Sequence, residues 1–315
     1  LMFETGHFAT LWHKMALRLD IQPEFLGLPG YEGWRHGVQA DMIEARLKED
    51  TNHELKAVCV VHNETSTGVT SDIAAVRKAI DTAGHPALLI VDTISGLASA
   101  DYRHDEWGVD VTVSGSQKGL MLPPGISFNA LSPKAIEVSK QAKLPKSFWA
   151  WDEILEANKN GYWPYTPSTN LLYGLNEALD MLLDEGMDHV LARHQRWAAG
   201  VRAAVEAWGL EIQCQDPSVY SPVLTGVVMP EGVDADAVRK IIYERFDLSL
   251  GMGLGKAKGK MFRIGHLGDC NDLTLIATLG GCEAGMKLSG VSLKGSGVTA
   301  ALDYFAANPL NAGER

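Results

Sequence analysis

The chain has 315 residues, of which 46% are hydrophobic and 21% charged. These proportions are typical of a globular protein with one large domain or two moderate ones. The formal net charge is −11, and the lysines and arginines form no run. Because nucleic acids and anionic membrane surfaces are bound by clustered positive charge, the composition argues against both partners. No apolar stretch approaches the roughly 18 residues that would span a bilayer.

The four cysteines form neither a C-x-x-C pair nor a zinc-site spacing. Four thiols in so long a chain do not make a disulfide framework, so a reducing, cytoplasmic compartment is expected. The carboxyl end has no Ser-Lys-Leu type of peroxisomal signal, which favours the same location. The histidines predict no metal site, since His189 and His194 would lie on different faces of a helix.

Strands and helices alternate between residues 57 and about 130. Three continuous apolar runs predict strands buried on both faces: Ala57–Val61, Ala87–Val91 and Val109–Val113. Between the first two, Ser71 or Asp72 can cap a helix that runs to Ala83 and stops at Gly84. This alternation predicts an α/β fold with a mostly parallel sheet and helices on both faces.

The second half of the chain is predicted to be more helical. Residues 130–168 are rich in proline and aromatic residues and are expected to be irregular. A leucine-rich helix should cover Asn170–Glu185 and end at Gly186, and a second helix should cover Asp188–Trp208. A smaller α+β unit is expected beyond it, with strands at Val223–Met229 and Met261–His266 and helices at Asp234–Phe246 and after Asn271. We place the boundary between a large domain (1–186) and a small domain (187–315) near Gly186.

One lysine follows the third apolar run among small residues, in the sequence Ser114-Gly115-Ser116-Gln117-Lys118. Small residues around a lysine at the carboxyl end of a strand leave room for a bulky group on its amine, and parallel sheets bind ligands at that edge. A lysine can act as a Schiff-base nucleophile when burial or a neighbouring cation lowers its pKa. The pentapeptide alone is equally consistent with an exposed lysine in a loop.

An aspartate, Asp92, ends the apolar run Leu88–Val91. Its carboxylate should lie at the edge of a buried sheet, where an unpaired charge is costly, so a cation is expected to face it. A protonated pyridine nitrogen would meet this need, and holding that nitrogen protonated makes a pyridoxal ring an electron sink. A strand-end aspartate that caps a turn or pairs with an arginine is the alternative.

Six stretches distributed along the chain carry a family resemblance: Val91–Ile94, Asp101–Asp110, Ser114–Lys118, Pro123–Gly125, Tyr162–Pro167 and Phe262–Gly268. They are similar to the class V aminotransferases, and in particular to the serine–glyoxylate (alanine–glyoxylate) aminotransferases of bacteria and plants. The similarity covers essentially the whole chain. It implies a pyridoxal-phosphate enzyme of fold type I with a large cofactor-binding domain.

The resemblance also implies a role for individual residues. Lys118 would hold pyridoxal 5′-phosphate as a Schiff base and carry the proton between substrate and cofactor, and Asp92 would pair with the pyridine nitrogen. Ile94 and Phe8 would pack on the two faces of the ring. Arg263 would bind the substrate carboxylate, for which a planar two-pronged donor is well suited.

Three further residues are implied to contact the cofactor. The hydroxyl of Thr65 would reach the ring, and Gln117 and Thr166 would hold the phosphate. Thr166 would do so across a dimer interface, so a homodimer with its active site between the subunits is expected. Trp163 stands where some family members have tyrosine.

One part of the family pattern does not appear in the printed chain. Family members cradle the phosphate in a small-residue turn at a helix start, several tens of residues before the stacking aromatic. Only seven residues precede Phe8 here. We therefore expect this chain to lack the cradle and the N-terminal arm that helps dimerisation, so that the catalytic assignment concerns the full-length parent.

A glycine-rich segment, Gly251–Lys256, invites a nucleotide-binding interpretation. The phosphate-loop pattern fails there, because Leu250 stands in place of the required glycine and Ala257 in place of serine or threonine. A mobile loop near the substrate, just before Arg263, is expected instead.

The function implied by the resemblance is transfer of an amino group from serine or alanine to glyoxylate. The products would be glycine and either hydroxypyruvate or pyruvate. Another class V enzyme, such as a different small-amino-acid aminotransferase or a cysteine desulfurase, is the alternative within the family. A dehydrogenase would need a G-x-G-x-x-G motif, which is not found. A truncated, catalytically dead binding module is the non-enzyme alternative.

Overall fold

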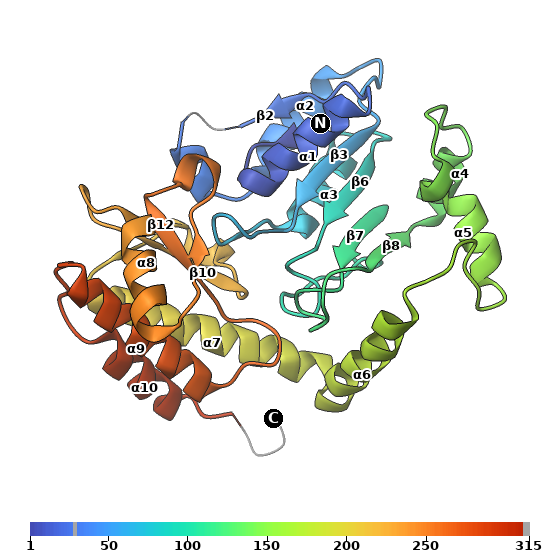
Figure 1. Cartoon of the computed structure of the whole chain (residues 1–315). Helices are drawn as coiled ribbons and strands as arrows, with labels where there is room; N and C mark the ends of the chain where they lie inside the picture. The colour runs from blue at the N-terminus through green and yellow to red at the C-terminus, as the bar shows by residue number, and fades with distance from the viewer. Residues whose placement is uncertain (28–29, 311–315) are drawn as a thin grey trace.

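The computed structural model describes residues 1–27 and 30–310. Its centre is a six-stranded sheet in the spatial order β2 (Phe25–Leu26), β1 (Met2–Phe3), β3 (Ala57–Val61), β6 (Leu88–Asp92), β7 (Val111–Gly115) and β8 (Ser127–Leu131). All neighbouring strands are parallel except β7 and β8, which are antiparallel (Figure 1). The predicted α/β class with a mostly parallel sheet is confirmed.

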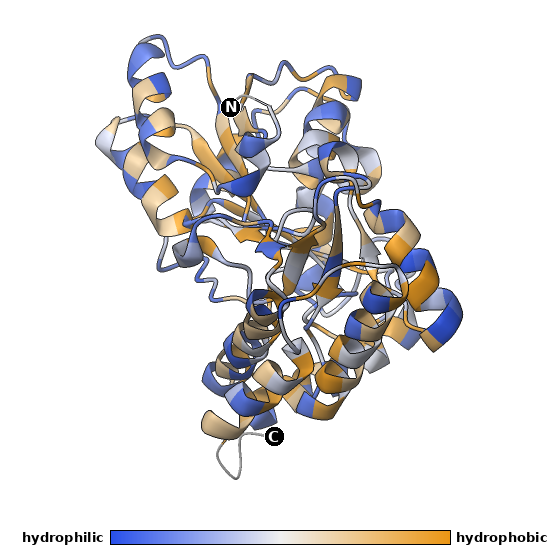
Figure 2. Cartoon of the chain, turned by 90° about the vertical axis from the view of Figure 1, so that its left-hand side faces the viewer, coloured by the Kyte–Doolittle hydropathy of each residue, from blue (hydrophilic) through white to orange (hydrophobic). Residues whose placement is uncertain are grey.

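Two helices, α2 (Ala40–Glu49) and α3 (Ile73–Thr82), cover this sheet through one apolar cluster. The cluster joins Ile43 of α2 and Val76 of α3 to alternate strand residues such as Val58 and Leu89, all of which are fully buried. Figure 2 shows the matching pattern, with strands largely in hydrophobic colours and helices that carry both kinds of residue. The sheet edge is therefore held in place by a packed core, which suits a site that must be rigid.

The helix predicted after residue 71 is confirmed together with its cap. The Asp72 carboxylate accepts a hydrogen bond from the backbone N–H of Ala75, which satisfies one of the unpaired amides of the first turn of α3. Gly84 follows the helix with a φ of 62°, a left-handed conformation that glycine adopts without strain.

The expectation that residues 130–168 are irregular is wrong in part. Helices α4 (Pro133–Ser139) and α5 (Trp151–Asn158) and the short 3-10 helix η2 (Ser147–Trp149) lie in this segment. Ser132 caps α4 by accepting a hydrogen bond from the N–H of Ala135, and Pro133 occupies the first turn. A capping serine followed by proline indicates a helix start, but the other prolines of the segment favoured the prediction of irregular structure.

The remaining elements form the C-terminal half and the edges of the site. Helices α6 (Thr169–Glu185) and α7 (Met187–Trp208) meet at Gly186, as predicted. A second, antiparallel sheet has the order β11 (Gly251–Met252), β12 (Met261–Gly265), β10 (Leu224–Val228) and β9 (Glu211–Ile212). The other elements are α1 (His7–Arg18), α8 (Ala235–Phe246), α9 (Asp272–Leu288), α10 (Gly297–Ala307), the hairpin β4 (Asn63–Glu64) and β5 (Val69–Thr70), and the 3-10 helices η1 (Glu32–Arg35), η3 (Pro217–Val219) and η4 (Gly255–Ala257).

Separate apolar clusters support the two domains that we propose. One cluster lies within residues 1–109 and another within residues 197–305. A smaller cluster spans the proposed boundary, since it joins Leu120 and Leu182 to Val190. In the described part of the chain, we find no helix that combines the length and apolarity needed to cross a membrane.

Candidate active site

Four neighbouring strands of the large sheet end at the same edge. Because β1, β3, β6 and β7 are parallel and adjacent, the segments that follow them converge where α/β sheets bind ligands. These segments carry six of the predicted site residues. In order across the sheet they are Phe8 after β1, Thr65 after β3, Asp92 and Ile94 at the end of β6, and Gln117 and Lys118 after β7. The topology thus gathers side chains that are up to 110 residues apart in the chain.

Lys118 lies in the turn that follows β7 and is half-buried. Its carbonyl accepts a hydrogen bond from the N–H of Met121 at 2.9 Å. The next residue, Gly119, packs so tightly on the preceding loop that a Cβ there would lie 2.1 Å from the carbonyl oxygen of Leu97. Burial, and then the nearby charge of Arg263, lower the pKa of the Lys118 amine. Both effects favour the neutral, nucleophilic amine.

Asp92 ends β6 with a carboxyl group that has no cation close to it among the described residues. Its Oδ1 accepts a hydrogen bond from the N–H of Ile94 at 2.8 Å. Burial raises the pKa of Asp92 to about 6, and the charge of Glu64 acts in the same direction. A carboxylate held in this way favours a cationic partner.

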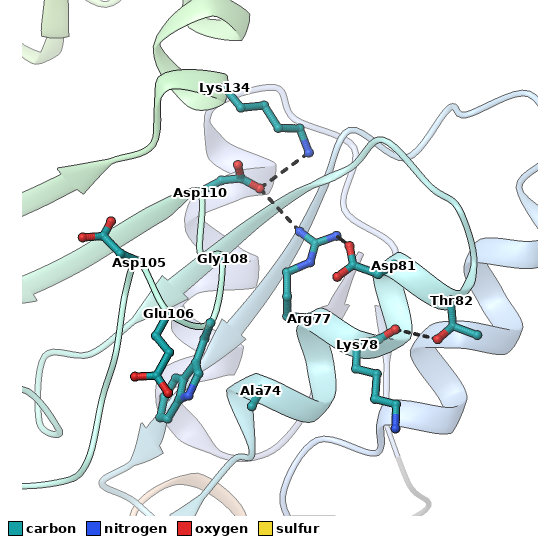
Figure 3. A pocket seen from close by; sticks show the side chains of 11 residues that line it. Ala74, Arg77, Lys78, Asp81, Thr82, Asp105, Glu106, Gly108, Asp110 and Lys134 are labelled. Carbon is teal, nitrogen blue, oxygen red and sulfur yellow. Dashed lines mark hydrogen bonds and ion pairs between the residues drawn. The ribbon is translucent and has the colours of Figure 1, made fainter.

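A second aspartate of the same sheet, Asp110, has the partners expected of a structural carboxylate. Asp110 precedes β7, at the opposite edge from Asp92, and is buried, whereas Asp92 is half-buried. Its oxygens accept hydrogen bonds from the N–H of Leu89 and the hydroxyl of Ser132, both at 2.9 Å. Arg77 and Lys134 each lie 3.7 Å from it, in a shallow surface pocket (Figure 3). Asp110 is therefore fully paired, whereas Asp92 is not.

Arg263 reaches the site from the second sheet, on β12. Its Nη1 donates to the carbonyl of Thr65 at 2.7 Å, and its Nε donates to the carbonyl of Met252 at 2.9 Å. Gly251, its partner on β11, has no side chain that would collide with the guanidinium, since a Cβ there would lie 3.2 Å from Nε. Two backbone carbonyls thus fix the plane of the guanidinium, although 198 residues separate Arg263 from Thr65.

Phe8 is the second residue of α1 and is half-buried. The first turn of this helix is held by Glu64, which accepts hydrogen bonds from the N–H groups of Phe8 at 3.3 Å and Ala9 at 3.1 Å. Ile94, also half-buried, lies in the turn after Asp92. Each of the two predicted ring-packing residues therefore donates its backbone N–H to a carboxylate at a strand end.

The two residues predicted to contact the phosphate lie in different parts of the structure. Gln117 is exposed next to Lys118, at the edge where the other residues gather. Thr166 is exposed in the segment between α5 and α6, which Figure 1 shows well apart from the ends of β6 and β7. Among the described residues, no hydrogen bond joins Thr166 to Gln117 or Lys118.

The glycine-rich segment contains β11 and enters η4, and it contacts the N-terminal part of the chain. Lys256 forms an ion pair of 2.5 Å with Glu4, and the indole N–H of Trp34 donates to the same carboxylate at 3.0 Å. A Cβ on Gly255 would lie 2.6 Å from the Trp34 ring. The sequence did not single out Glu4, Trp34 or Glu64; the signal for Glu64 was an acidic residue that follows a buried strand, as in Asp92.

Comparison with known proteins identifies the family. The aminotransferase class-V family model matches residues 6–257. The chain belongs to the class V aminotransferases. It is therefore an aminotransferase, which moves an amino group between an amino acid and a 2-oxo acid, and its cofactor is pyridoxal phosphate.

Two curated relatives and one solved structure illustrate the similarity. The chain is 47% identical to serine–glyoxylate aminotransferase from Hyphomicrobium methylovorum over 98% of this chain and 76% of that protein. It is 45% identical to L-aspartate–glyoxylate aminotransferase from Paracoccus denitrificans over 95% and 75%. The crystal structure of pyridoxamine–pyruvate aminotransferase from Mesorhizobium loti superimposes with a TM-score of 0.88 at 29% identity, and covers 98% of this chain and 78% of that one.

The residues present fit this cofactor. A partly desolvated lysine amine can bond the cofactor aldehyde, and the unpaired Asp92 carboxylate can accept a hydrogen bond from a protonated ring nitrogen. These two groups follow adjacent parallel strands, β6 and β7. The sheet edge therefore offers an amine for the aldehyde of the cofactor and a carboxylate for its ring nitrogen.

Proposed function

We propose that the protein transfers an amino group from serine to glyoxylate, giving hydroxypyruvate and glycine. The observation that carries this proposal is the convergence of Lys118, Asp92 and Arg263 at one sheet edge. Both curated relatives described above carry glyoxylate in their names, whereas their donors differ. Glyoxylate as acceptor is therefore better supported than serine as donor, and alanine, which would give pyruvate, is the second candidate.

Each residue has a defined task in the proposed reaction. Bound pyridoxal phosphate supplies a ring that takes up the electron pair left when the substrate α-proton is removed. The Lys118 amine takes this proton and later returns it, for which a lowered pKa is suited. Asp92 keeps the ring nitrogen protonated. Arg263 holds the substrate carboxylate, so that the α-carbon faces Lys118.

The cysteines support an aminotransferase over a cysteine desulfurase. A desulfurase needs a reactive thiolate, which a low pKa provides. Burial raises the pKa of Cys59 and Cys214 to about 11, raises that of Cys282 to about 12, and also raises that of Cys270. All four thiols are unpaired, and this also supports the cytoplasmic location that we propose.

A substrate assay of the full-length protein tests the proposed function. Serine, alanine and aspartate are compared as donors to glyoxylate, with product formation measured for wild type and Lys118→Ala. We expect the highest kcat/KM with serine and no detectable turnover by Lys118→Ala. A preference for aspartate would replace the donor, and turnover without Lys118 would contradict the assignment of the catalytic lysine. Cofactor binding without turnover of any pair would favour the dead binding module.

We also propose that two copies of the chain form a homodimer with the active site between them. Several large apolar side chains are exposed around the segment that carries Thr166: Phe148, Trp149, Tyr162, Trp163, Tyr165, Tyr173 and Leu183. Such a patch on a monomer marks an interaction surface. A second copy would cover this patch and bring its own Thr166 to the phosphate. Sedimentation velocity of wild type and Leu183→Glu tests this, with dimer expected for the first and monomer for the second.

A further inference from the structure

A buried carboxylate, Glu64, bonds the start of the helix that carries Phe8, and its charge acts on the pKa of both Asp92 and Arg263. It ends β4 and is 1% exposed. Its Oε1 accepts hydrogen bonds from the N–H of Ser66 at 3.1 Å, the hydroxyl of Ser66 at 2.6 Å and the N–H of Phe8 at 3.3 Å. Its Oε2 accepts one from the N–H of Ala9 at 3.1 Å. A group so buried and so fully bonded is costly to disturb.

Glu64 and Ser66 together replace the local cap that α1 lacks. The N-cap residue Gly6 makes no side-chain hydrogen bond, and the first turn holds no acidic residue. The first three helical amides are instead bonded from another part of the chain: that of His7 to the Ser66 hydroxyl at 2.8 Å, and the next two to Glu64. A carboxylate at a helix N-terminus also interacts favourably with the helix dipole.

The start of α1 is shaped to admit this carboxylate. A Cβ on Gly6 would lie 2.4 Å from Cγ and Cδ of Glu64 and 2.5 Å from the Ser66 hydroxyl oxygen. Glycine at position 6 is therefore required by close approach. Any larger residue at position 6 would collide with the Glu64 side chain.

The cap connects three residues that the proposed function places around the cofactor and substrate. Phe8 donates its own N–H to Glu64, and Thr65 lies between the two capping residues. The carbonyl of Thr65 in turn accepts the hydrogen bond from Arg263. A shift of Glu64 would move the ring-packing aromatic and loosen the backbone acceptor that orients the guanidinium.

We propose that Glu64 is a positioning residue that holds Phe8, the Thr65 turn and Arg263 in one fixed arrangement around the cofactor ring. This inference rests on the proposed function. In Glu64→Gln an amide –NH₂ would face backbone or hydroxyl donors, because the carboxylate accepts all four of its hydrogen bonds to Phe8, Ala9 and Ser66. The variant therefore loses at least one bond at the start of α1 while keeping the size of the side chain.

The test compares Glu64→Gln with the loss of a different helix cap, Asp72→Ala on α3. Asp72 also caps a helix of the large domain but is exposed and does not belong to the sheet edge of the site. Three quantities are measured: amide hydrogen exchange at residues 7–10 without cofactor, the Kd for pyridoxal phosphate, and the visible circular dichroism of the bound cofactor. Thermal unfolding of each variant reports general stability.

For Glu64→Gln we expect faster exchange at residues 7–10, a Kd raised about tenfold and a weaker cofactor dichroism. Asp72→Ala should lower the unfolding temperature but leave all three quantities as in wild type. Ser66→Ala retains Glu64 and should change the three quantities in the same direction, by a smaller factor, so a misfolded Glu64→Gln does not end the test.

Two results would overturn the inference. Wild-type Kd and dichroism in both Glu64→Gln and Ser66→Ala would show that Glu64 only caps a helix. Equal changes in Asp72→Ala would show that the effect is general loss of stability. A wild-type protein that does not bind pyridoxal phosphate would be a different result, because it would contradict the proposed function itself.

Discussion

Replacing Asp92 with asparagine should stabilise the cofactor-free protein. Burial raises the pKa of Asp92 to about 6 from the ordinary aspartate value of 3.8. Because the pKa is higher in the folded state, folding favours the protonated carboxyl group. The folded protein is therefore most stable with respect to Asp92 below about pH 3.8, and it loses this stability as the pH rises through about 6. At about 1.4 kcal/mol per pKa unit, ionised Asp92 costs the fold up to about 3 kcal/mol. Asparagine carries no charge, and its side-chain oxygen can still accept the N–H of Ile94.

The same substitution should damage function. Without the anion opposite the ring nitrogen, removal of the substrate α-proton should slow by about a thousandfold, as expected when a buried charge partner is lost. Urea unfolding of the cofactor-free protein at pH 8 and pH 4 measures the stability change. Single-turnover absorbance of the loaded protein measures the chemical step. The stability gain should be large at pH 8 and small at pH 4.

Asp110→Asn is the matched control, since Asp110 is buried in the same sheet and bonded to Leu89, Ser132 and two cations. Removing its charge leaves Arg77 without its buried partner and should destabilise the protein by about 2 kcal/mol at pH 8. Cofactor affinity should not change. If Asp92→Asn destabilised the cofactor-free protein as Asp110→Asn does, or slowed the chemical step less than tenfold, Asp92 would be a structural carboxylate and our reasoning would fail.

Three further results are expected. Arg263→Lys should raise KM for serine and glyoxylate together, by about 5- to 150-fold for a loss of about 1–3 kcal/mol, whereas Arg239→Lys, which loses bonds to the Leu250 carbonyl, should leave KM within about threefold. Steady-state kinetics measures KM, and gel filtration measures how much cofactor each variant retains. Loss of cofactor from Arg263→Lys without a rise in KM would contradict the assignment of Arg263 to the substrate carboxylate. The Kd for the cofactor should rise about fivefold between pH 6 and pH 5, because a cationic ring nitrogen needs the ionised Asp92 carboxylate and the ionised fraction falls by that factor when the pKa is about 6. The same rise in Asp92→Asn would refute that cause. Mixed dimers of Thr166→Ala and Lys118→Ala chains should regain one site of wild-type affinity, and isothermal titration that finds none would exclude the shared site.

Much of the fold is predictable because its signals are local. Asp72, Asp234 and Asn271 all accept hydrogen bonds from the first turns of the helices they were expected to start. The strand predicted at Val109–Val113 begins two residues later, at Val111, and the Asp110 carboxylate just before it binds the N–H of Leu89. The apolar run alone does not reveal that contact.

The site was predictable to the extent that parallel strands define it. Asp92 and Lys118 follow apolar runs, and the order of the strands then places them together. The pairing of Arg263 with Thr65 follows from no spacing, since it depends on how the two sheets approach each other. Glu64 was missed for the same reason: its partners on α1 precede it by 55 and 56 residues.

Trapping the cofactor on the protein tests the central claim most directly. Borohydride reduction of the loaded full-length protein converts a lysine–cofactor bond into a stable one, and tryptic peptides are then weighed. We predict that the cofactor mass appears on a peptide of residues 104–134, in which trypsin no longer cleaves after Lys118. Cofactor mass on another lysine, or none on any peptide of a protein that shows the visible absorption of bound cofactor, would contradict Lys118 as the cofactor-bearing residue.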